Sequence, residues 1–219
     1  MNDNAYQAMA ETHEVFNLPQ PLENYNLFRS DVALQQAVKR EGAAPFTNII
    51  DNFGALTGSA EVTQWGFQAN KVKPEFRTHD RYGRRVDEVD FHPAYHHLMR
   101  TSIENGLHAI PWTEQKPGAN VYRAALSFMM SQVDAGHGCP ITMTFAAIPT
   151  LQKQPEIAAQ WAPLITSRVY DPTNKPYFEK QGVTQQYRET DQRQSQPVLV
   201  AHMPLAGPEE KEHDEEKRQ

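Results

Sequence analysis

A single uncharged stretch gives the clearest indication of how this chain folds: Cys139-Pro140-Ile141-Thr142-Met143-Thr144-Phe145-Ala146-Ala147. Pro140 suits the first turn of an α-helix, where a backbone N–H has no intrahelical partner to lose. The residues after it are apolar on nearly every side of such a helix, which is typical of a helix buried among others. We therefore expect a buried helix from Pro140 with a kink or a break at Pro149. Cys139, the one cysteine of the chain, is then expected to be a small buried residue at the helix start.

Start and stop signals predict further helices on both sides of this stretch. A residue that can begin a helix stands before most of them, and a glycine follows most of them. The predicted helices run from Ser30 or Asp31 to Glu41, from Phe46 to Phe53 with Gly54 as the stop, from Thr57 or Ser59 to Asn70, from Pro93 to Gly106, from Asn120 to Gly136, and from Ile157 to Ile165. In the helix from Asn120, the expected core-facing stripe is Val121, Ala124, Ala125, Phe128, Met129 and Val133.

Residues 71–91 have a different pattern. Two short runs, 76–79 and 86–91, flank the turn-forming segment 80–84, which contains Gly83. This arrangement predicts two antiparallel strands around a glycine turn. The expected fold is therefore mainly α, with antiparallel helices joined by short connections and a small two-strand excursion near 76–91.

The chain divides into three parts by composition. Residues 1–29, with Pro19 and Pro21, are expected to form an extended arm that needs another surface to order it. Residues 30–184 carry the helical patterns. Residues 185–219 are polar and rich in charge apart from a brief apolar run at 197–204, and are predicted to be largely disordered.

Charge and composition exclude several classes of function. The 219 residues carry a formal net charge of -6, which argues against a protein that binds the nucleic-acid backbone. The N-terminus lacks a basic and apolar leader, and no apolar run is as long as a membrane span. A cytoplasmic, soluble protein without a membrane segment is expected.

Two groups of residues are weak candidates for chemistry. Four histidines crowd one region, and two of them are four residues apart, a spacing that suits a shared metal ion: His92, His96, His97 and His108. However, Pro93 stands where the zinc-protease pattern needs a glutamate, and packing roles are the favoured interpretation. Glu88 and Asp90 point the same way on a predicted strand, but a solvated carboxylate pair usually serves solubility. No metal ligand and no catalytic residue is therefore predicted.

Three stretches resemble the AidB branch of the acyl-CoA dehydrogenases, the branch induced by DNA alkylation. They are 12–22 (Thr-His-Glu-Val-Phe-Asn-Leu-Pro-Gln-Pro-Leu), 80–85 together with 91–96, and 139–147, and the resemblance covers about residues 10–184. In that family this region is the N-terminal helical domain, followed by a β-barrel and a C-terminal helical bundle. The resemblance implies a flavoprotein oxidoreductase in which FAD lies between these domains, a proton and a hydride leave an acyl thioester, and subunits form homo-oligomers. Family DNA binding is associated with a basic surface near the C-terminus.

The chain departs from this family after Thr184. The family continues into an apolar strand and a glycine-containing segment that wraps the flavin, whereas this chain continues with Gln185-Gln186-Tyr187-Arg188. The glutamate base of the family also lies beyond the region matched. The resemblance therefore implies a truncated N-terminal part, inactive alone, that retains no FAD. It implies substrate-channel candidates in the first turns of the helix from Pro140, for which core packing is the alternative: Thr142, Met143, Thr144 and Phe145.

Two other functions stay open at this point. One is a non-catalytic subunit-interaction or oligomerisation module, whose arm and hairpin dock on full-length subunits. The other, less favoured, is a histidine-based metal protein.

Overall fold

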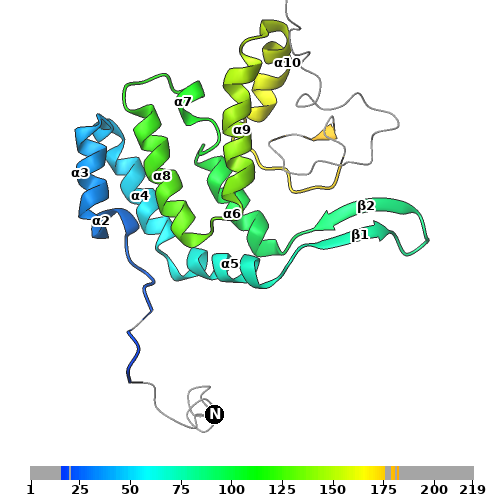
Figure 1. The fold of residues 1–219 in the computed structure, drawn as a ribbon, viewed down its shortest axis with the longest axis horizontal. Helices are drawn as coiled ribbons and strands as arrows, with labels where there is room; N and C mark the ends of the chain where they lie inside the picture. Colours follow the sequence, from blue (N-terminus) through cyan, green and yellow to red (C-terminus); the bar gives the residue numbers. More distant parts are fainter. Residues whose placement is uncertain (1–15, 20, 176–178, 181, 183–219) are drawn as a thin grey trace, which may run out of the picture.

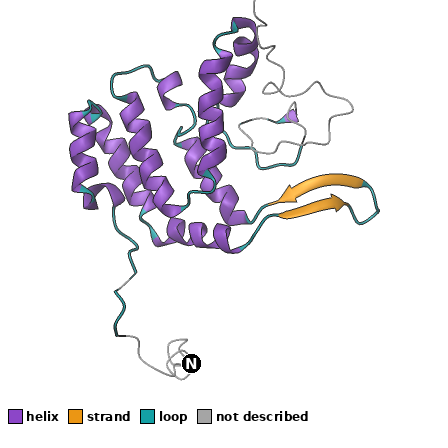
Figure 2. Cartoon of the chain, in the orientation of Figure 1, coloured by secondary structure: helices purple, strands orange, loops and turns teal. Residues whose placement is uncertain are grey.

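The computed structural model describes residues 16–19, 21–175, 179, 180 and 182. Helices form most of this part of the chain, and a two-stranded antiparallel sheet projects from them (Figures 1 and 2). The predicted fold class, mainly α with a two-strand excursion, is confirmed. In chain order the elements are α2 (Leu27–Ser30), α3 (Val32–Arg40), the 3-10 turn η1 (Ala44–Phe46), α4 (Thr47–Thr57), α5 (Ala60–Lys71), β1 (Glu75–His79), β2 (Arg85–Asp90), α6 (Pro93–Glu104), α7 (Ile110–Thr113), α8 (Ala119–Val133), α9 (Gly138–Leu151) and α10 (Pro155–Ile165).

Capping side chains begin three of the predicted helices where expected. The Asp31 carboxylate accepts the backbone N–H of Leu34 at the start of α3, over 2.8 Å. The Ser59 hydroxyl accepts from Val62 at the start of α5, over 3.3 Å. At α6, Nδ1 of His92 accepts the N–H of Ala94, and Pro93 occupies the first turn. Each cap satisfies a donor that the helix itself leaves unpaired.

The predicted stop at Gly54 is wrong, because α4 continues past it to Thr57. Gly54 serves a close approach instead. A Cβ there would lie 2.5 Å from Oδ1 of Asn26 and 2.7 Å from the backbone nitrogen of Phe28. α2 therefore packs directly on the backbone of α4. The expected arm 1–29 overlaps α2: its residues 27–29 are helical, and Leu27 and Phe28 are buried.

The predicted stripe on α8 is rotated relative to the real core face. Ala124 is exposed and Phe128 is 51% exposed. The buried side chains of α8 are Ala119, Tyr122, Ala125, Leu126, Met129 and Met130. Both stripes satisfy helical spacing, so periodicity alone could not choose between them.

One hydrophobic core joins the helices. It draws on α2, α3, α4, α5, α6, α8 and α9, and its fully buried side chains include Ile50, Phe53, Leu98, Ile103, Leu126 and Met129. The rings of Phe46 and Tyr122 stack with centroids 4.7 Å apart, which ties η1 to α8. α10 packs on α9 but contributes no fully buried residue.

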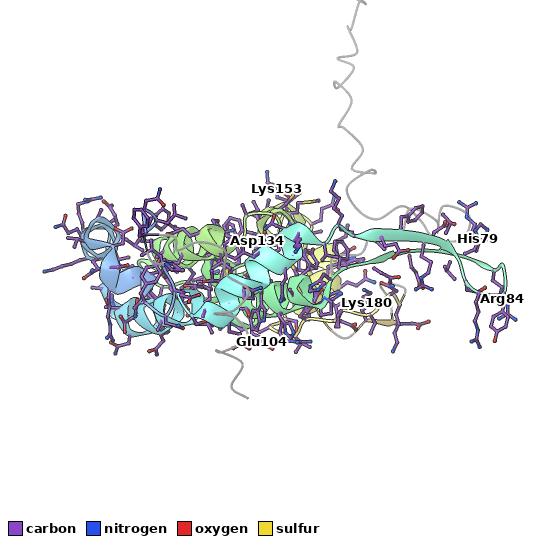
Figure 3. The ribbon with its side chains drawn as sticks, turned by 90° about the horizontal axis from the view of Figure 1, so that it is seen from below. His79, Arg84, Glu104, Asp134, Lys153 and Lys180 are labelled. Atoms are coloured by element: carbon purple, nitrogen blue, oxygen red, sulfur yellow. The ribbon has the colours of Figure 1, made fainter. Side chains whose placement is uncertain are left out.

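The hairpin of β1 and β2 stands away from the helices, with His79 and Arg84 near its far end (Figure 3). Glu75 pairs with Asp90 and Arg77 with Glu88, and the register shifts between Arg77 and His79. Gly83 has a positive φ of 78°, as the turn requires. These strands confirm the predicted excursion.

The segment after α10, residues 166–175, is called the C-terminal strap here. It crosses back over the helices and is held there by three contacts. The hydroxyl of Tyr170 lies 2.7 Å from Nδ1 of His96. Nε2 of His108 donates to the carbonyl of Ser167 over 3.0 Å, and Arg168 pairs with Glu114. The expected arm before residue 16 and the tail from 185 lie outside the described residues.

Candidate functional site

α9 carries the predicted site and is less buried than its sequence suggests. Residues 138–151 contain no charged side chain, yet of these residues two hydrophobic side chains are fully buried, Ile141 and Ile148. The prediction of a helix buried on all sides is therefore wrong for this chain. The exposed residues follow one stripe along the helix: Cys139, Thr142, Met143, Ala146 and Thr150. Cys139 lies on this stripe, so the expectation that it is buried is also wrong.

The four predicted channel residues divide between the two faces of α9. Thr142 is exposed and Met143 is 65% exposed, so both face outward. Thr144 and Phe145 are partly buried. The Thr144 hydroxyl donates to the carbonyl of Pro140 over 3.0 Å and is thereby occupied within the helix.

Phe145 is fixed from two sides. The guanidinium carbon of Arg123 lies 3.7 Å from the centre of its ring, and the Trp112 ring is 5.2 Å away. Arg123 also donates from Nε to the carbonyl of Leu107 over 2.7 Å. Burial lowers the pKa of Arg123, and the aromatic face offers the cation partial compensation. Phe145 is thus a packing anchor that joins α7, α8 and α9.

Pro149 does not divide α9, so the predicted break is wrong, and the alternative of a kink stays a prediction. The helix continues for two residues to Leu151. Proline has no N–H to give to the carbonyl four residues earlier, which is that of Phe145. Nε1 of Trp112 donates to this carbonyl over 3.1 Å. A side chain from another helix therefore replaces the missing backbone hydrogen bond.

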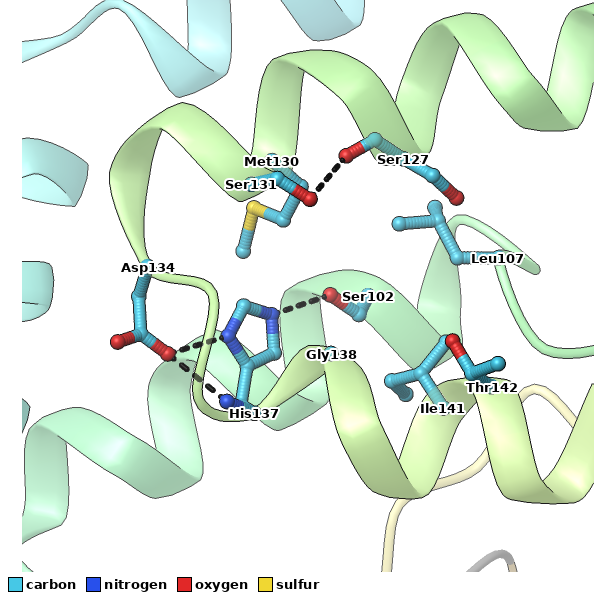
Figure 4. Close-up of a pocket in the computed structure, with 10 residues that line it drawn as sticks. All are labelled: Ser102, Leu107, Ser127, Met130, Ser131, Asp134, His137, Gly138, Ile141 and Thr142. Atoms are coloured by element: carbon cyan, nitrogen blue, oxygen red, sulfur yellow. Dashed lines mark hydrogen bonds and ion pairs between the residues drawn. The ribbon is translucent and has the colours of Figure 1, made fainter.

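A chain of hydrogen-bonded polar groups, three of them buried and one, Asn70, exposed, holds the start of α9 (Figure 4). Oδ2 of Asp134 accepts from the backbone nitrogen of His137 over 2.9 Å and from its Nδ1 over 2.7 Å. Nε2 of His137 then lies 2.9 Å from the Ser102 hydroxyl on α6. Oδ1 of Asp134 accepts from Nδ2 of Asn70 on α5, over 2.8 Å. We call these four residues the Asp134 relay.

The hydrogen bonds of the Asp134 relay fix the charge of Asp134 and the position of the proton on His137. Ser102 and His137 have 0% and 1% of their surface exposed, and Asp134 has 7%. The hydrogen bond from His137 holds the pKa of Asp134 well below its ordinary value, against the opposing effect of burial. With the carboxylate ionised, Nδ1 of His137 must be the donor, and in the neutral ring the Ser102 hydroxyl donates to Nε2.

A small pocket lies beside the relay. Its volume is about 50 Å³, and its walls come from α6, α8, α9 and the loops between them. The lining residues are Ser102, Leu107, Ser127, Met130, Ser131, Asp134, His137, Gly138, Ile141 and Thr142. A space of this size holds a few water molecules. Thr142 belongs both to this wall and to the exposed stripe of α9.

The order of Ser102, His137 and Asp134 is the hydrogen-bond order of a serine-hydrolase triad. A nucleophile, however, must reach the carbonyl that it attacks. Ser102 has no exposed surface, and the neighbouring pocket is far smaller than an acyl thioester. The relay therefore acts on position: it fixes the first turn of α9 to α5 and α6.

Sequence reasoning missed this relay. Asp134 and His137 lie in the break between two predicted helices, in the segment Asp134-Ala135-Gly136-His137. Asp134 stands three residues before His137, the N-cap of α9, and so does not occupy the position of a capping residue. Ser102, the partner of His137, lies 35 residues away from it in sequence and could be assigned to it only from the structure.

The other sequence candidates serve separate structural contacts. The four histidines have different partners: His92 caps α6 through Ala94, His96 contacts Tyr170, His97 stacks on Trp65, and His108 binds the carbonyl of Ser167. Glu88 and Asp90 both pair with Arg77 across the hairpin. Within the part of the chain that the structure describes, no group of three or more His, Cys, Asp or Glu could hold a metal ion.

The pocket beside the Asp134 relay is too small for a flavin. Its volume is about 50 Å³, and the polar atoms of the relay are already bonded to one another. No step can therefore be assigned through a flavin held by these residues. In the same described ranges, no helix is both long and apolar enough to cross a membrane.

The fold defines the class of the protein as the helical domain of the acyl-CoA dehydrogenases. Two solved structures share it. Bd2924 in its apo form has a TM-score of 0.61 and 26% identity, over 69% of this chain and 32% of that one. ACDH-11 of Caenorhabditis elegans, in complex with C11-CoA, has a TM-score of 0.59 and 20% identity, over 74% of this chain and 29% of that one.

The sequence defines the family more narrowly. Residues 17–172 match the family described as the adaptive response protein AidB N-terminal domain, so the chain belongs to the AidB family. The chain is 44% identical over 175 residues to the putative acyl-CoA dehydrogenase AidB of Escherichia coli K12. That match covers 79% of this chain and 32% of the relative. The chain therefore spans about a third of the length of the curated relative that it matches.

Proposed function

We propose that this chain carries the N-terminal helical part of an AidB-like, FAD-dependent oxidoreductase that acts on acyl thioesters, and that this part is inactive alone. Two considerations support the proposal. The family is that of a putative acyl-CoA dehydrogenase, and the match spans 32% of that relative. The resemblance also places the flavin-wrapping segment and the catalytic glutamate beyond the region that this chain matches.

The exposed stripe of α9 is the wall that this chain would contribute to the acyl site. Thr142 and Met143 face outward on a helix with no charged residue, which suits contact with a hydrocarbon chain. Thr144 and Phe145 lie behind them, and the contacts of Phe145 with Trp112 and Arg123 keep the helix in place. The uncharged outward stripe is the observation that carries the assignment. The C11-CoA bound by the structural neighbour ACDH-11 is consistent with it.

A photoreactive long-chain acyl-CoA tests the acyl wall. We expect light-dependent labelling of the tryptic peptide between Arg123 and Lys153, which contains α9, and competition by unlabelled acyl-CoA. Met143→Glu places a charge on the stripe and should reduce the labelling. Ala124→Glu places the same charge on an exposed position of α8 and should leave it unchanged. Labelling spread over other peptides, or insensitive to Met143→Glu, would contradict the assignment.

Flavin retention tests the proposed inactivity. The purified chain is mixed with FAD, passed through gel filtration and scanned in the visible flavin bands. We expect no retained absorbance, because the resemblance places the segment that wraps the flavin beyond the region that this chain matches. A stoichiometric flavin band would overturn this part of the proposal.

The biological setting follows from the family resemblance. We assign the parent protein to the adaptive response to DNA alkylation, as a homo-oligomer in the cytoplasm. The single cysteine leaves no intrachain disulfide to suggest an oxidising compartment. A role in DNA binding is not proposed for this chain, since its net charge of -6 opposes contact with phosphates.

A second candidate is a non-catalytic module that docks on full-length subunits. The hairpin favours it, because it projects from the helices with Phe76 61% and Tyr82 66% exposed. Three exposed apolar side chains of the arm also favour docking: Phe16 is 88% exposed, Leu18 69% and Leu22 78%. Co-purification with a tagged full-length AidB-family protein tests it. Phe76→Ser should weaken the association, whereas Phe128→Ser, on exposed α8 surface, should not.

A further inference from the structure

β1 has one edge that no strand covers in the described part of the chain. Its other edge pairs with β2, and the described sheet consists of these two strands. All five residues of β1 are exposed, and the hairpin stands away from the helices (Figure 3). The backbone N–H and C=O groups along an uncovered edge are a template for a further strand.

The irregularity of the hairpin lies on β2 rather than on β1. Between Arg77 and His79, two steps along β1 face three steps along β2. The extra residue therefore belongs to β2, where Asp87 has a positive φ of 46°. A bulge twists an edge and discourages further pairing. From Glu75 to Arg77, β1 keeps a regular register and carries no bulge.

Glu75 carries a charge that the hairpin does not balance. It lies directly opposite Asp90, and like charges in opposite positions destabilise a pair of strands. Asp90 accepts from Nε of Arg77 over 3.0 Å. The Glu75 carboxylate is exposed and has no ion pair within the described residues. A cation from outside the hairpin would balance it.

Arg77 has donors left for such a contact. Its Nη2 donates to Glu88 over 2.6 Å, and its Nε serves Asp90. A guanidinium has five N–H groups, and the two on Nη1 make no hydrogen bond in the part of the chain that the structure describes. Glu75 and Arg77 are two residues apart on one strand, so their side chains stand on the same face. Each β1 therefore offers a carboxylate without a cation and a guanidinium with free donors.

These charges select one register for two copies of β1. Opposite residues of an antiparallel pair share one hydrogen-bonding type, and the type alternates along a strand, so a symmetric pair is centred on a residue. A centre at Glu75 or at Arg77 would place like charges opposite each other. A centre at Thr78 would leave Glu75 beyond the partner strand. A centre at Phe76 pairs Glu75 of each copy with Arg77 of the other. Pro74 has no N–H to give and ends the ladder on each side.

We infer that β1 pairs antiparallel with β1 of a second copy of this chain, in the register centred on Phe76. The pairing covers the open edge and gives each Glu75 a cation. Phe76, which is 61% exposed, lies opposite Val89 in its own hairpin, so the two copies form one apolar row across four strands. The inference rests on the second candidate function only in taking the hairpin as an interaction element, and it does not depend on acyl chemistry.

A cysteine in place of Phe76 traps this pairing. Directly opposite residues have Cα atoms about 4.5–5.5 Å apart, which a disulfide can bridge. Cys139, the one cysteine of the chain, is first replaced by serine. Under mild oxidation, Phe76→Cys should form a disulfide-linked dimer about tenfold faster than Phe67→Cys, because pairing raises the local thiol concentration. Phe67 is the matched control, since it is 69% exposed on α5.

Glu75→Arg tests the charges without weakening the hairpin. The new side chain faces Asp90 within its own hairpin but faces Arg77 of the second copy. Two opposite-charge pairs then become two like-charge pairs, so cross-linking through Phe76→Cys should slow about tenfold. Glu61→Arg makes the same change of charge on exposed α5 surface and should leave the rate unchanged.

Two results would overturn the inference. One is an equal rate of cross-linking for Phe76→Cys and Phe67→Cys, and the other is an unchanged rate in the Glu75→Arg background. Co-purification with a full-length AidB-family protein separates the two proposals. A chain that co-purifies without cross-linking through Phe76→Cys would keep the docking role and overturn the strand pairing. Charge-dependent cross-linking without co-purification would support the strand pairing and overturn docking on full-length subunits.

Discussion

Trp112 supplies the hydrogen bond that Pro149 withholds from α9. The carbonyl of Phe145 would accept from residue 149 in an ordinary helix, and here it accepts from the indole of Trp112 over 3.1 Å. The same indole lies against the ring of Phe145, with the two ring planes tilted by 38°. A proline inside the last turn of an uncharged helix is thus tolerated because a partner from α7 completes the hydrogen bonding.

This relationship predicts that substitutions at the two positions are coupled. We expect Trp112→Phe to lower the free energy of unfolding by about 1–3 kcal/mol, because the Phe145 carbonyl loses its donor. In a Pro149→Ala background the loss should be smaller by about 1 kcal/mol, since the new N–H can serve the carbonyl. Urea denaturation of the four proteins gives the coupling energy. Strictly additive losses would show that the indole hydrogen bond does not replace the missing one.

Neutralising Asp134 should destabilise the fold far more than neutralising a surface cap. Its two oxygens accept three N–H donors, from Asn70 and His137, and an amide turns one of these acceptors into a donor. We expect Asp134→Asn to lower the free energy of unfolding by about 3 kcal/mol. Asp31→Asn is the control, because asparagine caps a helix as well as aspartate does. If Asp134→Asn and Asp31→Asn had equal midpoints in a urea titration, the relay would contribute nothing to stability.

A methyl group at Gly66 should force α5 and α8 apart. Its Cβ would lie 2.3 Å from the carbonyl oxygen of Val133, which is backbone and cannot swing away. Gly66→Ala should therefore cost about 1–3 kcal/mol, as overpacking does. Gly138→Ala is the matched control, since nothing lies within 4 Å of its Cβ position. Thermal unfolding of both variants should show a lowered midpoint for Gly66→Ala and an unchanged or slightly raised one for Gly138→Ala.

His108 should make the fold sensitive to acid. Burial lowers its pKa to about 4 from an ordinary value of 6.5, with Arg123 and Arg168 adding to the shift. Its Nδ1 is buried without a hydrogen-bond partner. The unfolded chain takes up the proton first as the pH falls, so stability is lost between about pH 6.5 and 4, and changes little from this cause outside that window. The loss amounts to about 3 kcal/mol.

His108→Gln tests this dependence while keeping a donor for the Ser167 carbonyl. Stability measured by urea at a series of pH values should rise with pH in the wild type and much less in the variant. His96, whose pKa burial also lowers, accounts for a residual slope of the same sign. A variant with the full wild-type slope would assign the acid sensitivity to other groups.

Local signals were sufficient for most of the helices and for the hairpin. Three helix starts could be recognised from residue type alone. Asp31 and Ser59 cap their helices through hydrogen bonds within one turn, and Pro93 fits a first turn because it has no N–H to satisfy. Gly54 was misread because its role depends on Asn26 and Phe28 packing against it. A glycine that ends a helix and a glycine that admits a neighbour look alike without the neighbour.

The site was predicted less completely for a related reason. The uncharged run from Pro140 correctly located the helix, but its burial depends on what lies beside it, and Met143 is 65% exposed in this chain. The relay depends on Ser102, which meets His137 across 35 residues of sequence, and on Asn70, which meets Asp134 across 64. Such long-range partners leave no periodic pattern, so neither could be derived from spacing.

The C-terminal strap also sets an order of events during synthesis. The contact between His96 and Tyr170 joins residues 74 positions apart, and that between His108 and Ser167 joins residues 59 apart. At about 5–20 residues per second, the ribosome needs roughly 4–15 s to extend the chain from His96 to Tyr170. During this time α6 lacks its contact with Tyr170. The helices made first therefore lack their final contacts during that interval. A chaperone that binds nascent apolar helices could bind them before the strap is made.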